Sequence, residues 1–499
     1  MSAEQANSGQ SIVFVHCDSM DGRVMGCMGH PAVRGATPNF DALAARGVLF
    51  RNTYTNNPIC CPSRASMWSG RFTHNCGGWN NFKGLDPDEP TCHTRLRDAG
   101  YRLQSFGKTD YVSGSHTIRA RVTPWTRAAG IARPAYRMPG PEVIEDRRER
   151  VNEHDWGNVD RAVDWLGNEA AGSEAPFFLY LGINQPHPRF RTSRLYLDRI
   201  APDSVELPAP DERRHPVFEL MAIQENWMHG LDEETVRRVR RIYFAMVAEV
   251  DAMLGRVLEA VQESGLSDST WIIFSSDHGE MNMEHGQFYK MTHYEPSARV
   301  PLIIAGPEAR AGAEVEALTS LVDIYPTLMD ITGLEHPPGL DGYSLMPDLA
   351  GEQGTRPERV LAEFHGTTSC TGAFMLRQGP WKYIAYPGFR PQLFNLEEDP
   401  GEVDDLADSL PHVVANLDAA LREIVDYEAV DARVKAYDRE SFYHWRRGQL
   451  DAGTYRDTMA RVYSGFDRLP DEEVEPWTDE DEARIERWLR GAEPWTEET

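Results

Sequence analysis

The stretch NPICCPSRASMWSGRF, Asn57 to Phe72, places two adjacent cysteines between two prolines, directly before a segment of helical character. Pro58 and Pro62 favour an extended chain around the cysteines. The following letters SRASMWSG predict a short helix, with Gly70 as its stop. The cysteine pair is therefore expected at the beginning of a helix.

This position gives the two cysteines chemical interest. Free N–H groups and the helix dipole favour an anion there and make a thiol more acidic. Arg64, just inside the helix, is placed to bind two oxygens of a sulfate or phosphate. The residues alone leave two interpretations open: Cys60 and Cys61 contain a nucleophile at an anion site, or both are buried cysteines that pack a helix start.

Strand and helix patterns alternate on both sides of this stretch. Continuous apolar strands separated by helices predict an α/β fold, with a mostly parallel sheet covered by helices on both faces. The predicted strands are SIVFVHC, YRLQSF, FFLYLGIN, STWIIFSS and VPLIIAGP, and a long helix is predicted in ETVRRVRRIYFAMVAEVDAMLGRVLEAVQESG.

The pattern changes at a polar linker over Gly351–Arg359. Short strands follow, separated by turn residues, and they predict an antiparallel sheet. These strands are RVLAEFHG, GAFMLRQG, PWKYIAYPG and PQLFNLEEDPGE. We therefore expect a catalytic domain over residues 1–352 and a smaller C-terminal domain over 353–499, ending in an acidic helical tail.

The composition excludes several classes of function. A net charge of −27 argues against nucleic-acid or anionic-membrane partners, which usually meet a basic surface. An anionic substrate would require local cations or a metal inside its pocket. The N-terminal letters lack a basic segment and an apolar run of signal-peptide length, so a cytoplasmic protein without membrane spans is expected. The seven cysteines show neither a disulfide framework nor a zinc pattern.

Polar residues follow the predicted strands, at the edge where an open α/β sheet binds its ligands. Singly, each is more typical of a turn or helix cap, but together they suit a divalent metal and an oxyanion. Oxygen ligands favour Ca²⁺ or Mg²⁺, and an imidazole nitrogen shifts the preference toward Mn²⁺. The candidates are Asp18, Asp21, Lys108, Asp110, His187, Asp277 and His278, with Lys290 downstream.

The segment Cys60–Arg71 matches the pattern C-x-P-S-R-x-S-x-x-x-G-R and thereby resembles the formylglycine-dependent sulfatases. GKTDY, NQPHP, SSDHGE and the C-terminal WKYI…PQLFNLEEDPGEVDDLA resemble further elements of that family, so the likeness spans nearly the whole chain. The resemblance implies an alkaline-phosphatase-like fold. It also implies that the formylglycine-generating enzyme oxidises Cys60 to Cα-formylglycine, whereas Cys61 occupies a variable position.

The same resemblance assigns roles to the strand-end residues. It implies that Asp18, Asp277, His278 and residue 60 hold a divalent metal, with Asp21 or Ser19 as further candidate ligands. Ca²⁺ is the expected ion, and Mn²⁺ and Mg²⁺ are alternatives. Hydrated formylglycine would supply the nucleophile. Arg64, Lys108 and Lys290 would stabilise the sulfate oxygens, and His187 would protonate the leaving group.

Shorter segments are similar to the glucuronate-2-sulfatase branch of the family, which acts in glycosaminoglycan breakdown. They are SMDGR, WNNFKGLDP, GKTDYVSG and EFHG. Ser19 and Asp110 stand where many sulfatases have an aspartate and a histidine, and this branch shares both departures. The branch implies a small 2-O-sulfated uronate or an aryl sulfate as substrate. Candidate partners for a uronate carboxylate are Lys83, His116, Arg121 and Arg127.

Two alternatives to a sulfatase are carried forward. A phosphonate monoester or phosphodiester hydrolase shares the formylglycine, the metal and the Asp-His pair, and its substrate carries a similar charge. A non-catalytic binder of sulfated glycans would keep the fold with an unmodified Cys60. A homo-oligomer is compatible with the charged C-terminal extension.

Overall fold

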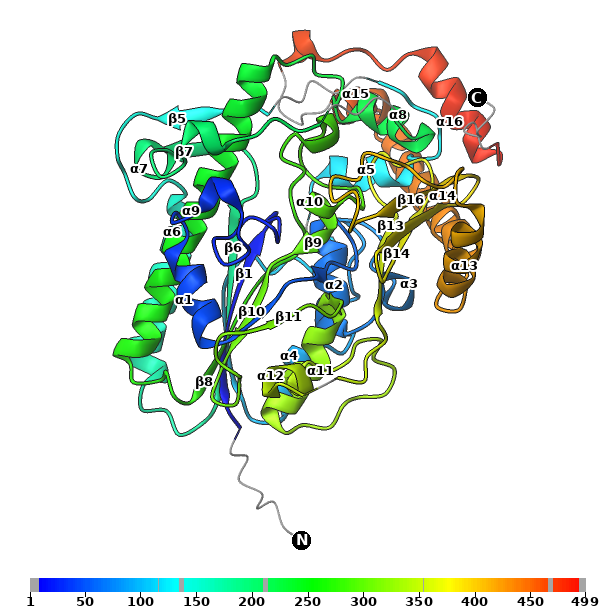
Figure 1. The fold of residues 1–499 in the computed structure, drawn as a ribbon. Helices are drawn as coiled ribbons and strands as arrows, with labels where there is room; N and C mark the ends of the chain where they lie inside the picture. Colours follow the sequence, from blue (N-terminus) through cyan, green and yellow to red (C-terminus); the bar gives the residue numbers. More distant parts are fainter. Residues whose placement is uncertain are drawn as a thin grey trace.

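The computed structural model describes most of the chain (Figure 1). Residues 1–8, to which the expected lack of a signal peptide partly refers, lie outside the described residues, as do 493–499 of the acidic tail. The described ranges are 9–114, 116–133, 139–209, 214–352, 354–464 and 470–492.

A seven-stranded sheet forms the centre of the described molecule, with strand order β11-β2-β10-β8-β1-β6-β4. Six strands run in the same direction, and β10 runs against them. The mostly parallel sheet is therefore confirmed, although VPLIIAGP supplies its antiparallel member. The strands are β1 (Ser11–Asp18), β2 (Val48–Phe50), β4 (Arg102–Gly107), β6 (Phe177–Pro186), β8 (Thr270–Ser276), β10 (Leu302–Ala305) and β11 (Ala313–Val315).

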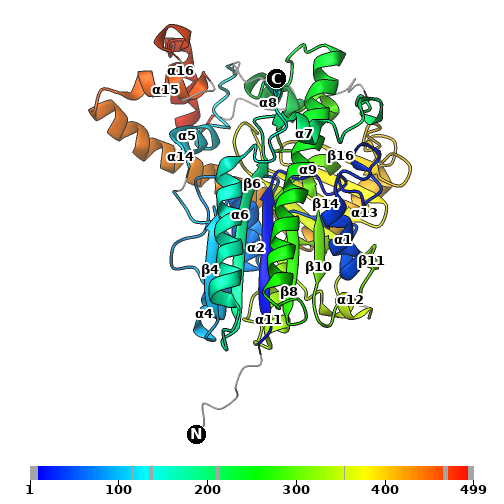
Figure 2. The same cartoon turned by 90° about the vertical axis from the view of Figure 1, so that its left-hand side faces the viewer.

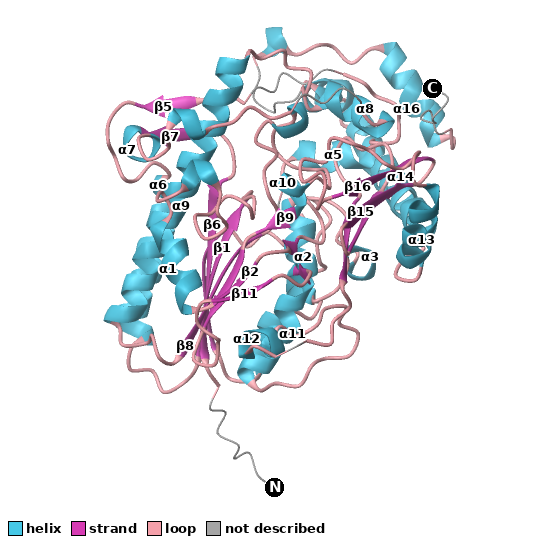
Figure 3. Ribbon diagram, viewed as in Figure 1, coloured by secondary structure: helices cyan, strands magenta, loops and turns pink. Residues whose placement is uncertain are grey.

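Helices cover both faces of the sheet (Figure 3). Each face of the sheet therefore packs into its own hydrophobic core, and alternate residues of β1 belong to the two cores. Val13 and Val15 pack toward one helical layer, and Ile12 and Phe14 pack toward the other. One layer contains α1 (Pro38–Arg46), α6 (Glu153–Trp165) and α9 (Glu233–Glu263); the other contains α2 (Cys60–Ser69), α4 (Cys92–Asp98), α11 (Ile324–Thr332) and α12 (Met346–Ala350).

Smaller elements connect these layers. Two short sheets join segments that are distant in sequence, and short helices lie between the main ones. The strands are β3 (Thr53–Tyr54), β9 (Arg299–Val300) and β12 (Thr319–Ser320) in one sheet and β5 (Glu142–Ile144) and β7 (Arg191–Ser193) in the other; the helices are α3 (Thr73–Cys76), α5 (Ile118–Trp125), α7 (Arg194–Leu197), α8 (Pro216–Gln224) and α10 (Glu295–Ala298).

The predicted antiparallel sheet follows the linker, in the order β13-β14-β15-β16. Its cores are completed from the N-terminal part of the chain: Trp79 packs with this sheet, and Trp125 of α5 packs with the last helices. The boundary at residue 352 stays a prediction. The elements are β13 (Arg359–Phe364), β14 (Ala373–Gln378), β15 (Trp381–Tyr386), β16 (Phe389–Asn395), α13 (Pro411–Arg422), α14 (Tyr427–Asp451), α15 (Tyr455–Tyr463) and α16 (Asp479–Leu489).

Among the described helices, none is both long and apolar enough to cross a bilayer. The long helix α9 illustrates the reason, because exposed arginines and glutamates alternate with its buried positions. Its apolar residues instead face the sheet.

A buried ion cluster ties the C-terminal sheet to the main domain. The Lys382 ammonium on β15 lies 2.6 Å from a carboxylate oxygen of Glu402 and 2.8 Å from one of Glu295 on α10. Burial alone would raise the pKa of Glu295, but the charges of Lys382 and Arg299 bring it down to about 2. Tyr54 on β3 donates a further hydrogen bond to Glu295. One lysine thus holds carboxylates from two parts of the chain.

Removing this lysine should destabilise the fold. Lys382→Ala leaves buried Glu402 without its cation and Glu295 with Arg299 alone, and we expect the free energy of unfolding to fall by about 3–5 kcal/mol. Urea denaturation measures the change. Arg256→Ala removes an exposed ion pair with Glu259 on α9 and should cost less than about 1 kcal/mol. Equal losses in the two variants would show that Lys382 does not hold the two parts together.

Candidate active site and metal centre

The register of the central sheet brings several strand ends to one level. Asp18 at the end of β1 pairs with Pro186 of β6, and Cys17 pairs with Ser276 of β8. Helix α2 begins at Cys60 beside these ends. The predicted positions after the strands therefore converge on one site.

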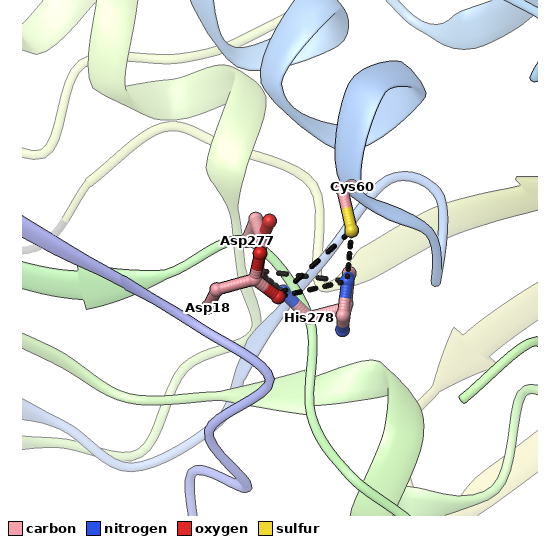
Figure 4. Close-up of side chains that lie close together, drawn as sticks. All are labelled: Asp18, Cys60, Asp277 and His278. Atoms are coloured by element: carbon pink, nitrogen blue, oxygen red, sulfur yellow. Dashed lines mark hydrogen bonds and ion pairs between the residues drawn. The ribbon is translucent and has the colours of Figure 1, made fainter. Parts of the chain in front are cut away.

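Four of the predicted residues form a buried group: Asp18, Cys60, Asp277 and His278 (Figure 4). One potential ligand atom from each lies within 4.8 Å of all the others. The His278 Nε2 atom lies 3.3 Å from the Cys60 sulfur and 3.6 Å from an oxygen of each aspartate. Two carboxylates, an imidazole and the side chain at position 60 suit a divalent cation.

The protonation states also fit a metal centre. His278 Nδ1 lies 2.9 Å from the Gly279 carbonyl oxygen; donation there leaves the lone pair of Nε2 facing the site. Burial lowers the pKa of His278, which keeps its imidazole neutral. Burial would raise the pKa of both aspartates, but Lys108 lowers that of Asp18 and Arg64 lowers that of Asp277. Both carboxylates are therefore ionised, as metal ligands must be.

The two further candidate ligands have other partners. The Ser19 hydroxyl donates to Asp18 at 3.0 Å, and its backbone N–H, held at a φ of 65°, donates to Asp277 at 3.3 Å. Asp21 receives three hydrogen bonds from the Arg23 guanidinium instead of facing the other carboxylates. Ser19 therefore orients two aspartates, and Asp21 lies outside the four-residue group.

Arg64 differs from its expected role as a sulfate contact. Its side chain is completely buried, and its Nε donates to Asp277 at 2.8 Å. Its other nitrogens donate to the Tyr180 hydroxyl at 2.7 Å and to backbone carbonyls. With its donors engaged inside the protein, Arg64 is a positioning residue that neutralises and orients a metal ligand.

The expected acidic thiol is also corrected. Burial and the nearby Asp18 carboxylate raise the pKa of the Cys60 thiol, although Lys108 and Lys290 oppose the change. The effect expected from the helix N-terminus is outweighed, because the thiol is buried and faces a carboxylate at 3.8 Å. An unmodified Cys60 is thus a weak nucleophile in this setting.

Lys108 contacts the site from the end of β4. Its ammonium forms an ion pair with Asp18 and lies 3.4 Å from Asp110. His116 lies 2.8 Å from both oxygens of Asp110, so an imidazole is connected to the site through this carboxylate. Among the candidates for binding a uronate carboxylate, His116 is thereby connected to Lys108.

His187 and Lys290 form a second cationic unit. His187 follows β6, and its Nε2 lies 2.7 Å from the Lys290 ammonium, while its Nδ1 donates to the Pro188 carbonyl at 2.6 Å. Burial and the Lys290 charge lower the pKa of His187 to about 3. The imidazole is therefore neutral, and its Nε2 accepts a hydrogen bond from the Lys290 ammonium.

The other three carboxylate candidates lie in different settings. Arg127 is buried between Asp438 at 3.0 Å and Asp431 at 3.4 Å, so it holds α14 and is not a substrate contact. Arg121 lies over the ring of Phe82, with its guanidinium carbon 4.1 Å from the ring centre. Lys83 pairs with Asp86 at 2.6 Å. Arg121 and Lys83 therefore lie near Asn81, whose side-chain oxygen accepts a hydrogen bond from the Cys61 backbone N–H.

Two residues of the site were missed by the sequence analysis. Tyr180 lies within an apolar strand, and its hydroxyl joins Arg64 to His16. Tyr243 on α9 accepts from the Asp21 backbone N–H and donates to the Ser19 carbonyl. An aromatic residue in a buried strand or helix is indistinguishable from a core residue in sequence, so no signal marked either one.

The family model for sulfatases matches residues 10–334, and the model for the C-terminal part of N-sulphoglucosamine sulphohydrolase matches 283–427. The chain belongs to the sulfatase family. Arylsulfatase K of Bos taurus is 43% identical over 463 residues, covering 88% of this chain and 85% of the relative. Arylsulfatase K of Homo sapiens is 42% identical over 470 residues, covering 89% and 87%.

Solved structures agree with this sulfatase fold. A phosphonate monoester hydrolase of Agrobacterium radiobacter is 25% identical with a TM-score of 0.69, covering 85% of this chain and 96% of the other. A 2-O GAG sulfatase is 25% identical with a TM-score of 0.67, covering 85% and 94%. These structures confirm the predicted alkaline-phosphatase-like fold, and the family and the arylsulfatase K relatives confirm the predicted sulfuric ester hydrolase class.

Metal binding should stabilise this sulfatase through the four-residue group. A cation at 100 times its Kd should raise the free energy of unfolding by about 2.7 kcal/mol, which thermal unfolding in a Ca²⁺ or Mn²⁺ series detects. Asp277→Asn should weaken the metal affinity at least about tenfold, because it removes a charged ligand. Asp21→Asn should leave the affinity unchanged. Equal weakening by both variants would place Asp21 in the metal site.

Proposed function

We propose that this sulfatase releases sulfate from 2-O-sulfated glucuronate residues, using formylglycine at position 60 and a divalent cation, with Ca²⁺ as the expected ion. The observation that carries the proposal is the location of Cys60 within the cluster of Asp18, Asp277 and His278. The likeness to arylsulfatase K and to a 2-O GAG sulfatase supports the substrate class.

The bound cation would neutralise sulfate charge and lower the pKa of a hydroxyl at position 60. The chain's own residues prepare this centre. Arg64 and Ser19 fix Asp277, and Lys108 holds Asp18 while presenting a positive charge at the rim. The Lys108 charge is thus preorganised for the sulfate oxygens, and such electrostatic preorganisation contributes several kcal/mol in active sites.

The Lys290–His187 pair supplies the proton for the leaving oxygen. A sugar oxygen is a poor leaving group and needs protonation as its bond to sulfur breaks. Lys290 Nζ donates to His187 Nε2, so the lysine can pass a proton to the imidazole, which then donates it to the leaving oxygen. When a sulfate binds beside Lys290, its negative charge offsets the cation that suppresses protonation of His187.

Maturation of position 60 must precede folding in this proposal. Cys60 has only 3% of its surface exposed, and it lies on the first turn of a fully buried helix. The formylglycine-generating enzyme therefore has to reach the segment before α2 packs. A binder of sulfated glycans would retain cysteine, so the chemical state of residue 60 separates the enzyme from that alternative.

Phosphonate ester hydrolysis is the second candidate function. The fold and metal site are compatible with it, and the Agrobacterium radiobacter phosphonate monoester hydrolase matches most of this chain. Comparing 2-O-sulfated glucuronate with an aryl sulfate and an aryl phosphonate decides between them. A dominant phosphonate activity would replace the sulfatase proposal.

Position 60 should be the only essential cysteine of the pair. Cys60→Ala removes the precursor of the nucleophile and should lower sulfate release at least about a thousandfold. Cys61→Ala, the matched neighbour, should stay within about tenfold of wild type. Mass spectrometry of the peptide 52–71 reports whether Cys60 is converted. A fully active enzyme with an unconverted Cys60 would contradict the proposal.

The leaving-group role of His187 should depend on the substrate. His187→Ala should reduce kcat/KM for the sugar sulfate by about 10²–10⁴-fold, since protonation of its oxygen is lost. An aryl sulfate with an acidic phenol needs little protonation and should lose less than about tenfold. Steady-state kinetics on both substrates measures the difference. An equal loss on both would assign His187 to sulfate binding instead.

A further inference from the structure

A cavity of about 390 Å³ lies outside the four-residue group, between β5, α7 and the first turns of α9. Four arginines and two glutamates line it, together with apolar residues. The charged residues are Arg194, Arg237, Arg238, Arg241, Glu145 and Glu234. In a chain of net charge −27, a hollow with more arginines than carboxylates is a local reversal of sign.

The arginines in the first turns of α9 face different surroundings, depending on their position around the helix. Residues three or four apart share a face, so Arg237, Arg238 and Arg241 point toward the same side. Arg240, which belongs to the same RRVRR run, is buried and donates to the Asn282 carbonyl at 2.8 Å. One arginine is thus used inside the protein, and three line the cavity.

Carboxylates offset part of the positive charge, since Glu145 and Glu234 also line the cavity. Arg194 pairs with Glu145 at 2.9 Å, and Asp146 pairs with Arg148 outside the cavity. Asp198 pairs with Arg147, and its charge also opposes the lowering of the pKa of Arg241 by burial. Arg237 and Arg238 are exposed, and within the described ranges no carboxylate forms an ion pair with either. Two guanidinium groups therefore remain available to an anionic ligand.

The guanidinium of Arg241 is held in place at the cavity by backbone carbonyls. Its Nε donates to the Ile200 carbonyl at 2.9 Å, and its Nη2 donates to the Leu197 carbonyl at 3.1 Å. These bonds fix the guanidinium at the end of α7. A fixed cation beside two free ones binds an anion with less loss of side-chain entropy than three mobile side chains would.

The cavity and the catalytic centre lie at the same end of the sheet but on opposite sides of α9, because Tyr243 reaches Ser19 from the helix face opposite the cavity. Figure 1 shows β7 and α7 beside α9, and Figure 2 shows α7 beside α9, at the end of the molecule toward which β1 and β6 run. His187 and Arg194 are seven residues apart, which limits their backbone separation to about 25 Å. An extended oligosaccharide of several sugars is long enough to span this separation.

We propose that this cavity is a second subsite, which binds sulfate or carboxylate groups on sugars beyond the one that is hydrolysed. The apolar walls formed by Val143, Leu197 and Ile242 suit the C–H faces of sugar rings. The acidic remainder of the surface disfavours long polyanions such as nucleic acids. The choice of a glycan rests on the proposed function, whereas the anion site rests on the cavity itself.

Binding of a heparin octasaccharide to the inactive Cys60→Ala protein tests the subsite without turnover. Adding Arg237→Ala and Arg238→Ala should raise the Kd about 5- to 30-fold at low salt, measured by titration calorimetry. Arg97→Ala with Arg256→Ala removes two exposed charges elsewhere and should change the Kd less than twofold. Arg237→Lys with Arg238→Lys should retain most of the binding.

The active enzyme gives a second readout. In the enzyme that retains Cys60, Arg237→Ala with Arg238→Ala should leave kcat/KM for an aryl sulfate unchanged. That result would show an intact catalytic centre. No octasaccharide binding, or equal weakening by the control pair, overturns the subsite. Equally tight binding of a single-stranded DNA of the same charge overturns the glycan assignment. Absence of sulfate release by wild type contradicts the proposed function instead, and the calorimetry still decides the subsite.

Discussion

Two ionised carboxylates, Asp18 and Asp277, are buried side by side at the ends of neighbouring parallel strands. Such charges are unfavourable in a protein interior unless cations lie close to them. Arg64 satisfies one carboxylate and Lys108 the other, and the open side between them faces His278 and Cys60. The need to balance these charges explains why so many side chains of the site contact one another and not solvent.

This balance also separates the roles of the cationic residues. Arg64 offers a planar set of donors that fits a fixed carboxylate, a hydroxyl and backbone carbonyls. Its donors are engaged by these groups inside the protein. Lysine carries a compact charge on a flexible stem. Five of the 51 basic residues are lysines, and three of them, Lys108, Lys290 and Lys382, lie at the site or in the buried ion cluster. The surface uses arginine, and lysine is kept for interior positions.

The C-terminal sheet contributes to the site through the segment that carries Lys290. Met291 donates a backbone hydrogen bond to Pro58, and Glu295, four residues later, is held by Lys382 of β15. The segment is thus fixed at one end to the chain before Cys60 and at the other to the C-terminal sheet. Stability of the C-terminal part and placement of the Lys290–His187 pair are therefore linked through a few buried bonds.

The sequence by itself determined the layered α/β architecture, because apolar strands and amphipathic helices leave clear periodic patterns. The resemblance of Cys60 to Arg71 to the sulfatase pattern also separated two otherwise equivalent cysteines. Asp18, Asp277 and His278 could be predicted because they follow strands whose ends must meet at one edge. The antiparallel direction of β10 could not be predicted, since a short buried strand reads the same in both directions.

Only the tertiary structure decided the partners of each charge. It turned Arg64 toward Asp277, Asp21 toward Arg23 and Arg127 toward two aspartates of α14. It also raised the pKa of Cys60, which the helix start alone would have lowered. The physical reason is the same in each case: electrostatic energy depends on distance and burial between residues far apart in the chain, and neither quantity is written in the local sequence.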